Sequence, residues 1–261
     1  MDNTVNIALS RIDVLSRALD VTANNLANAN TTGFKASRSL FTAYLAKQQG
    51  TNVVPGGREE VYSQDIAIYQ EHRQGPLQKT GNPLDFAIQG DGFFTVRTPA
   101  GVRLTRNGQF TRSADGTLVD SSGNPVLDIN GNNINLSNSQ DGRPMENITV
   151  SLDGTISQPL GQTGQGMTMK AIINVVSVDN LFTLKPEGGY LLLPTTPTHR
   201  VPRERRKIRQ GMIEDSNVNS VFEMTDMIRI QRDYDLNFQL LQTELTRQLN
   251  AIDKIMTEPS V

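Results

Sequence analysis

Acid–base catalysis in this 261-residue chain would have to centre on two histidines, and a thiolate nucleophile is excluded because the sequence has no cysteine. His72 stands beside Glu71 and near Asp65, whereas His199 has no acidic neighbour in the sequence. The chain lacks a Ser-His-Asp order with a nucleophile elbow, a His-Glu-x-x-His motif and a phosphate-binding loop. We therefore expect no catalytic residues, no metal ligands, no cofactor and no small-molecule substrate.

Paired carboxylates offer the one enzymatic alternative, a carbohydrate hydrolase or lyase. Asp85 and Asp91 would then need to lie about 5–10 Å apart. The Asp-Gly pairs do not follow the twelve-residue calcium loop that a Glu closes. The glycine-rich residues 90–92 (GDG) and 161–166 (GQTGQG) do not lie between a strand and a helix, so they are interpreted as turns.

Charge is nearly balanced over the whole chain, with 25 Lys and Arg against 27 Asp and Glu. Nucleic-acid binding is therefore not expected, since it usually requires a basic face. Residues 203–209 (RERRKIR) hold five basic residues in seven, but no aromatic side chain stands nearby to stack on a base. A solvated face, or a strip that forms salt bridges with an acidic neighbour, is the favoured interpretation.

Helix-breaking residues divide the chain into three parts. Twenty of the 21 glycines and 11 of the 12 prolines lie between Gly50 and Gly211. Residues 1–32 and 212–258 contain neither, which predicts two long helices around a region of short elements. The first residues, MDNTVNIALSRID, lack the basic and apolar regions of a secretory signal peptide.

Both terminal segments carry apolar residues at alternating spacings of three and four, the heptad seam of paired helices. The N-terminal helix should end in residues 28–33 (NANTTG), because Asn and Gly tolerate the left-handed conformation. Ser220 and Glu223 form a predicted capping box at the start of the C-terminal helix. The two seams comprise Val5, Ala8, Ile12, Leu15, Leu19, Thr22 and Leu26, and Met224, Met227, Gln231, Tyr234, Phe238, Leu241, Leu245, Gln248, Ile252 and Ile255.

The middle of the chain predicts short antiparallel strands. Asn-Gly and Asp-Gly pairs at 91–92, 107–108, 115–116, 130–131, 141–142 and 153–154 are typical of tight hairpin turns. Strands are predicted in residues 93–97, 102–105, 116–119, 171–176 and 189–193. The predicted fold class is α+β, with long, coiled-coil-like N- and C-terminal α-helices flanking a mainly antiparallel β-domain.

Three blocks of sequence resemble the rod and hook proteins of the bacterial flagellar basal body. Residues 21–35 (VTANNLANANTTGFK) resemble the N-terminal signature of that family, and residues 74–94 (QGPLQKTGNPLDFAIQGDGFF) resemble its central motif. Residues 104–110 (LTRNGQF) and 116–119 (GTLV) continue the central motif, and residues 210–219 (QGMIEDSNVN) resemble the entry into the C-terminal helix. Within the family, the sequence of the central block is more similar to that of proximal-rod subunits than to that of distal-rod subunits.

The resemblance implies a non-enzymatic subunit of the axial rod, polymerised into the drive shaft and export channel that crosses the periplasm. Its implied partners are copies of itself, other rod and hook-family subunits, and the flagellar type III export apparatus, which requires no cleaved signal peptide. The expected parts are an N-terminal assembly helix and turn (1–45), a linker (46–75), a β-rich domain (76–211) and a C-terminal assembly helix (212–261).

The heptads and the resemblance together predict an assembly interface. A secreted or surface β-domain binding module with a coiled-coil stalk is the alternative, and it would form a small closed oligomer rather than an open helical stack. The predicted interface comprises Val5, Ile12, Leu15, Leu19, Leu26, Asn24, Asn25, Asn28, Gly33, Phe34, Met227, Tyr234, Phe238, Leu241, Leu245, Ile252 and Ile255.

Overall fold

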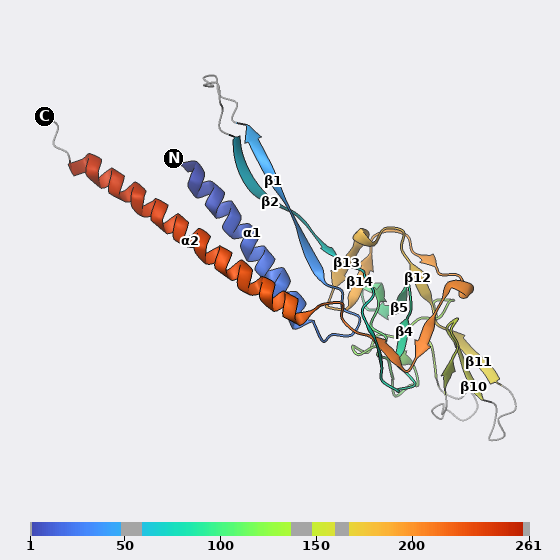
Figure 1. The fold of residues 1–261 in the computed structure, drawn as a ribbon. Coiled ribbons are helices and arrows are strands. Elements are labelled where there is room, and N and C mark those ends of the chain that lie inside the picture. Colours follow the sequence, from blue (N-terminus) through green and yellow to red (C-terminus); the bar gives the residue numbers. More distant parts are fainter. Residues whose placement is uncertain (1, 48–58, 137–147, 160–166, 258–261) are drawn as a thin grey trace. The chain divides into compact units, whose positions relative to one another are not determined.

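The computed structural model describes residues 2–47, 59–136, 148–159 and 167–257 (Figure 1). The chain forms two compact units. One, here called the helical unit, comprises residues 1–27, 37–70 and 219–261. The other, the β unit, comprises residues 28–36 and 71–218. The predicted fold class is confirmed, because two long helices flank antiparallel β-sheets in the order of the chain.

Two helices dominate the helical unit, α1 (Asp2–Ala27) and α2 (Ser220–Thr257). Neither contains glycine or proline, and α1 ends where the predicted Asn-rich turn begins. Within the unit the two helices run antiparallel and pack along each other (Figure 1). Over the residues described, neither helix has an apolar stretch sufficient to span a bilayer.

The start of α2 differs from the prediction in its cap. The side-chain oxygen of Asn219 accepts hydrogen bonds from the backbone N–H groups of Val221 (3.1 Å) and Phe222 (3.3 Å). The predicted capping box of Ser220 with Glu223 is therefore wrong, because the Glu223 carboxylate binds two other side chains of the helical unit. Asn219 is itself among the preferred N-cap residues.

A long hairpin completes the helical unit. Strand β1 (Ser37–Lys47) pairs antiparallel with β2 (Glu59–Gln70), from Ser37↔Gln70 to Lys47↔Glu59, with a register shift between Leu40 and Phe41. The sequence does not predict this hairpin, whose residues fall in the expected turn and linker. Residues 48–58 of that linker lie outside the described residues.

The β unit is built from short antiparallel strands. A six-stranded sheet has the order β13-β14-β6-β5-β12-β15, a three-stranded sheet has the order β11-β10-β9, and three pairs are β16-β4, β17-β3 and β7-β8. The strands are β3 (Leu77–Lys79), β4 (Phe86–Ile88), β5 (Phe93–Thr98), β6 (Gly101–Thr105), β7 (Thr111–Arg112), β8 (Leu118–Val119), β9 (Thr149–Val150), β10 (Thr155–Pro159), β11 (Met167–Ile172), β12 (Val175–Ser177), β13 (Leu184–Glu187), β14 (Leu191–Pro194), β15 (His199–Arg200), β16 (Ile208–Gln210) and β17 (Met212–Glu214). Two 3-10 helices are η1 (Leu181–Thr183) and η2 (Arg203–Arg205).

The predicted strands recur with one exception. The run 171–176 is not one strand, because β11 ends at Ile172 and β12 begins at Val175. Between them the Ile173 N–H donates to the Gly154 carbonyl (2.9 Å) and the Asn174 N–H donates to the Leu127 carbonyl (3.1 Å). The chain thus changes from one sheet to another within an apolar run.

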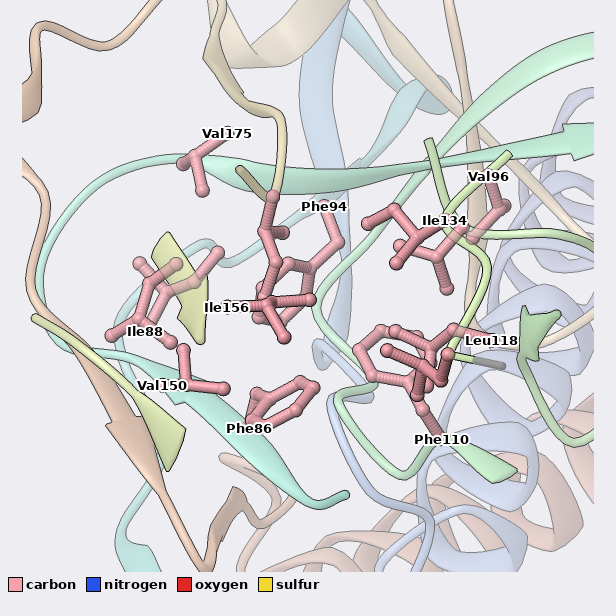
Figure 2. Packing of buried hydrophobic residues seen from close by; sticks show 14 of the residues in the cluster. Phe86, Ile88, Phe94, Val96, Phe110, Leu118, Ile134, Val150, Ile156 and Val175 are labelled. Carbon is pink, nitrogen blue, oxygen red and sulfur yellow. The ribbon is translucent and has the colours of Figure 1, made fainter. Parts of the chain in front are cut away.

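The core of the β unit is aromatic at its centre (Figure 2). Phe94 and Phe110 meet edge-on with ring centroids 5.3 Å apart, and Phe86 lies 5.9 Å from Phe110. Such edge-to-face pairs stabilise beyond the area that they bury. The aliphatic side chains around them include Ile88, Val96, Leu118, Ile134, Val150, Ile156, Ile173 and Val175.

Two glycines show what the predicted turns require. Gly116 has a φ of 80° and its N–H donates to the Ser113 carbonyl (2.9 Å), as in a tight turn. Gly108 instead permits a close approach, because a Cβ there would lie 1.6 Å from the backbone oxygen of Phe86. The turns predicted at 141–142 and 161–166 lie outside the described residues.

We expect Gly108→Ala to destabilise the β unit by about 3 kcal/mol or more, because backbone must move to admit the methyl group. Gly123→Ala is the matched control: that glycine has a φ of 81° but no atom within 4 Å of its Cβ position, so only strain of about 1–2 kcal/mol is expected. Hydrogen exchange of β5 amides measures both, and equal losses would contradict the close-approach argument.

Candidate assembly interface

The most buried side chains of α1 are small or polar. Ala8, Val14, Ala18, Thr22 and Asn25 form this line, and the helix packs against both α2 and the hairpin. Small residues let neighbouring backbones approach closely. The line includes Ala8 and Thr22 of the predicted seam, whereas the larger seam residues are only half-buried beside it, namely Val5, Ile12, Leu15, Leu19 and Leu26.

Helix α2 has a narrow line of half-buried side chains and an exposed apolar line next to it. Of the predicted residues, Met227, Tyr234 and Leu241 are half-buried, whereas Phe238 and Leu245 are 44% exposed and Ile252 is 54% exposed. Ile255 lies outside the residues whose side chains are described. Met224, Ile228 and Leu249 add to the exposed line.

The unequal lengths of the two helices explain part of this exposure. Helix α1 has 26 residues and α2 has 38, so α2 is longer by roughly 18 Å at 1.5 Å per residue. Because Asn25 contacts Glu223 at one end, antiparallel α1 reaches only to about residue 245 of α2. The exposed Leu249 and Ile252 lie beyond that point.

Asn25 ties the ends of three elements of the helical unit together. Its amide nitrogen donates to the Ser37 carbonyl (2.9 Å), and its amide oxygen accepts from the Ser37 N–H (2.8 Å). The same nitrogen donates to Glu223 Oε2 (3.2 Å), and Arg38 Nη1 donates to Glu223 Oε1 (2.8 Å). Asn25 is fully buried and Glu223 is 2% exposed. We call these four residues the Asn25 junction.

A second buried carboxylate organises the β unit. Glu214, at the end of β17, is 1% exposed and accepts hydrogen bonds from Lys35 Nζ, Arg106 Nη1 (3.1 Å) and the Gly75 N–H (3.0 Å). Lys35 Nζ also donates to the Arg73 carbonyl (2.9 Å). We call Glu214, Lys35 and Arg106 the Glu214 cluster. Residues of all three sequence blocks described above meet there.

Burial sets the electrostatics of the Glu214 cluster. Desolvation is the largest effect on Lys35 and lowers its pKa, while the Glu214 charge opposes that shift. Desolvation likewise lowers the pKa of Arg106 against the pull of Glu214. A buried ion pair of this kind adds little net stability, but removing one partner leaves an uncompensated buried charge that costs about 3–5 kcal/mol.

The remaining predicted residues near the end of α1 occupy different environments. Asn24 is exposed on α1, whereas Gly33 and Phe34 are buried in the β unit. A Cβ on Gly33 would lie 2.4 Å from the Asn107 backbone nitrogen. Asn28 is half-buried and accepts from the Thr31 hydroxyl (3.1 Å).

Sequence reasoning missed the roles of Glu214, Glu223, Arg106 and Arg38. Glu214 and Arg106 stand inside the blocks that carry the family resemblance, but nothing in those blocks assigns them a partner. Glu223 was interpreted as a capping residue. The signal that the sequence offers is a carboxylate beside apolar residues, Glu214 after Ile213 and Glu223 between Phe222 and Met224.

Asp85 and the two histidines, whose side chains are described, each have separate partners. The Asp85 carboxylate accepts from Thr80 (2.6 Å) and Asn82 (2.9 Å) within its own turn, and Asp91 is exposed. His199 forms an exposed pair with Asp179 (3.1 Å). The Asp65 side chain lies outside the described ones. In the described part of the chain, no group of three or more His, Asp or Glu residues could hold a metal ion.

His72 is a partly buried histidine held in its neutral form. Its ring lies edge-on to Phe93, with centroids 6.1 Å apart. Burial lowers its pKa from 6.5 to about 4, and the positive charges of Lys35 and Arg106 act in the same direction. These surroundings make His72 a poor base and a structural residue of the β unit.

Asn25→Ala should lower the unfolding free energy of the helical unit by roughly 2–4 kcal/mol, because buried partners at Ser37 and Glu223 lose their hydrogen bonds. Far-ultraviolet circular dichroism in denaturant measures this, since both helices belong to that unit. Asn24→Ala, at the exposed neighbouring position, is the control and should cost less than about 1 kcal/mol. Similar costs for the two variants would refute the role of the Asn25 junction.

Acid should destabilise the β unit through His72. Between the unfolded pKa of 6.5 and the folded pKa of about 4, the unfolded chain binds more protons, so stability falls as pH decreases. After discounting for solvent screening, we expect His72 to contribute roughly 1–2 kcal/mol of this loss.

Hydrogen exchange of β5 and β6 amides at neutral pH and near pH 4.5 would measure the effect. His72→Phe should reduce the loss of stability on acidification, and His199→Gln, at the other histidine, should not. An unchanged pH dependence in His72→Phe would show that carboxylates alone cause the loss.

Three family models match separate parts of the chain. Residues 6–35 match "Flagella basal body rod protein", residues 87–158 match "Flagellar hook protein FlgE/F/G D1 domain", and residues 209–250 match "Flagellar basal body rod FlgEFG protein C-terminal". The first and last matches include most of the two helices, and the middle one covers much of the β unit.

Full-length relatives agree with these matches. The chain is 37% identical to the flagellar basal-body rod protein FlgF of Caulobacter vibrioides over 98% of both chains. It is 34% identical to FlgF of Mesorhizobium japonicum over 97% of both chains. It is 33% identical to the rod protein FlgG of Agrobacterium fabrum, over 91% of this chain and 93% of that one. The chain therefore belongs to the FlgF/FlgG family of flagellar basal-body rod proteins.

Proposed function

We propose that this rod-family subunit polymerises through its helical unit, and that the exposed apolar line of α2 is the main contact between subunits. The line comprises Met224, Ile228, Phe238, Leu245, Leu249 and Ile252. One observation carries the proposal: these large apolar side chains are exposed along α2, and Leu249 and Ile252 lie where α2 continues past the reach of α1. Burying each of them fully would contribute about 1.5–3 kcal/mol.

The seam of α1 contributes a second part of the interface. Ile12, Leu15 and Leu19 are only half-buried beside the small-residue line, so part of their apolar surface is available to a neighbour. Val5 and Leu26 are half-buried in the same way. Together with Met227, Tyr234 and Leu241 of α2, these residues form the edges of the helix pair that a neighbouring subunit would cover.

Partners follow from family membership. We assign copies of this chain and other rod-family subunits as its neighbours, because relatives named FlgF and FlgG align with it almost end to end. The greater similarity to FlgF supports a place in the proximal rod. We also assign export by the flagellar type III apparatus, which handles subunits without a cleaved signal peptide.

The functional division along the chain stays a prediction. Assembly is assigned to residues 1–45 and 212–261, linkage to residues 46–75, and the β-rich domain to residues 76–211. The compact units cut across these bounds, since residues 28–36 belong to the β unit and residues 59–70 form β2 of the helical unit. The assembly role is therefore argued for the helices and not for whole segments.

Incorporation into purified hook–basal bodies tests the interface. Leu245→Glu/Leu249→Glu, expressed in a flagellated bacterium whose own copy has been deleted, should reduce the amount of the chain per particle by about tenfold or more, because two charges would enter an apolar contact. Thr243→Glu places one charge on an exposed polar position of the same helix and should incorporate normally. Quantitative mass spectrometry gives both ratios.

Two results would contradict the proposal. Normal incorporation of the double variant would show that this line of α2 is not the contact. Absence of the wild-type chain from the particles would overturn the assembly role altogether. Far-ultraviolet circular dichroism of each purified variant separates a lost contact from a misfolded subunit.

A further inference from the structure

From the arrangement of charge on the β unit, we infer that an exposed basic strip docks on a carboxylate-bearing surface of a neighbouring rod subunit. The strip is defined as Arg200, Arg203, Arg205, Lys207 and Arg209, all exposed. The inference rests on the proposed assembly of the chain, but it concerns a different surface from the apolar line of α2. It gives a role to the basic residues in 203–209, which take no part in the apolar interface.

Backbone contacts hold the strip in a fixed position. The Val201 N–H donates to the Val175 carbonyl (3.0 Å), and the Gln89 N–H donates to the Lys207 carbonyl (2.8 Å). The Ile208 N–H donates to the Leu152 carbonyl (2.9 Å). Ile208, the first residue of β16, is 1% exposed, so Lys207 just before it and Arg209 just after it project together to the outer face. The charges are thus preorganised, which reduces the entropy lost on binding.

A buried arginine strengthens the positive charge beneath the strip. Arg206 is 7% exposed, and its guanidinium donates to the carbonyls of Val201 (2.8 Å) and Ile173 (3.2 Å). These partners are neutral, so neither hydrogen bond supplies a counter-charge, although the fields of Asp153 and Glu204 act on Arg206. Burial lowers the Arg206 pKa most, and the nearby positive charges of Arg203 and Arg200 lower it further.

The strip has few counter-charges within its own unit. Among the described residues, no ion pair joins any of its five side chains to a carboxylate, and Arg209 contacts the neutral Gln89 (3.4 Å). Asp153 and Glu204 are the acidic groups whose fields reach Arg206, and the charge of Arg203 in the strip also acts on Asp153. A carboxylate-bearing partner would therefore relieve repulsion that the isolated subunit retains.

An acidic protein surface fits the strip better than other polyanions do. Residues 199–211 contain no Phe, Tyr or Trp side chain on which a nucleic-acid base could stack. The residues of the helical unit, in contrast, include thirteen Asp and Glu against nine Lys and Arg. A second copy of this chain therefore offers a net acidic surface of its own, and charge complementarity of this kind steers association and sets register.

Lys207 allows a direct test, because it is the one primary amine in the strip. A carbodiimide, which couples an amine to a contacting carboxylate, should link Lys207 to an Asp or Glu of a neighbouring subunit in purified hook–basal bodies. Lys207→Arg keeps the charge without the amine, so it should assemble normally and lose the cross-link. Mass spectrometry of the linked peptides identifies the partner.

Amine acetylation gives the complementary measurement. Lys207 should be labelled more slowly in particles than in the free subunit, by about fivefold or more, because a docked ammonium is desolvated. Exposed Lys185 on β13 serves as the reference amine. Particles that contain the chain but label Lys207 at the free rate would overturn the inference and leave the assembly proposal intact. Particles without the chain would instead overturn the assembly proposal.

Charge removal tests the strip as a whole. Arg203→Gln/Arg205→Gln should reduce incorporation by roughly threefold or more at physiological salt. The control, Lys79→Gln/Lys185→Gln, makes the same charge change at exposed positions elsewhere in the β unit and should not reduce incorporation. Equal incorporation of both variants would refute the inference. So would strip-dependent binding of the purified chain to vesicles rich in phosphatidylglycerol, since the partner would then be a membrane.

Discussion

Two buried carboxylates place the strictest condition on this fold. Glu214 in the β unit and Glu223 in the helical unit are almost completely shielded from water, and a carboxylate in that position is tolerated only with hydrogen-bond donors around it. Lys35, Arg106 and the Gly75 N–H satisfy Glu214, while Asn25 and Arg38 satisfy Glu223. Each unit therefore depends on a few polar contacts that must all form together. Apolar packing, by comparison, tolerates exchange of one residue for another of similar volume.

These contacts also connect opposite ends of the sequence. Lys35 and Glu214 are 179 residues apart, and Asn25 and Glu223 are 198 residues apart. Closing such long loops costs entropy before any contact rewards it. In each unit, the buried contacts made by residues near the end of α1 can therefore form only when the residues just before α2, or at its start, are available. A chain that lacks its C-terminal part would leave Lys35 and Asn25 without their buried partners.

Local signals were enough to predict much of this architecture. The absence of glycine and proline located both helices, and the Asn-rich turn located the end of α1. The hairpin was missed because residues 37–47 and 59–70 show no strict alternation and owe their pairing to each other and to α1. The predicted seam of α1 lies largely beside its most buried line, because the helix packs against both α2 and the hairpin and not against one helix alone. Glu223 was assigned to a cap because its true partners are far away in sequence, which no local pattern reveals.

The β1–β2 hairpin has a mechanical consequence. Its two strands pair from Ser37↔Gln70 to Lys47↔Glu59 with one register shift, and inter-strand hydrogen bonds lie across the strand direction. A force along the strands would load these bonds in shear, so that they share the load and do not open one at a time. At its base, the side chain of Asn25 holds Ser37 by both backbone groups, so tension in β1 would pass directly into the end of α1. In a shaft that turns under load, such an element would act as a stiff tie rather than a hinge.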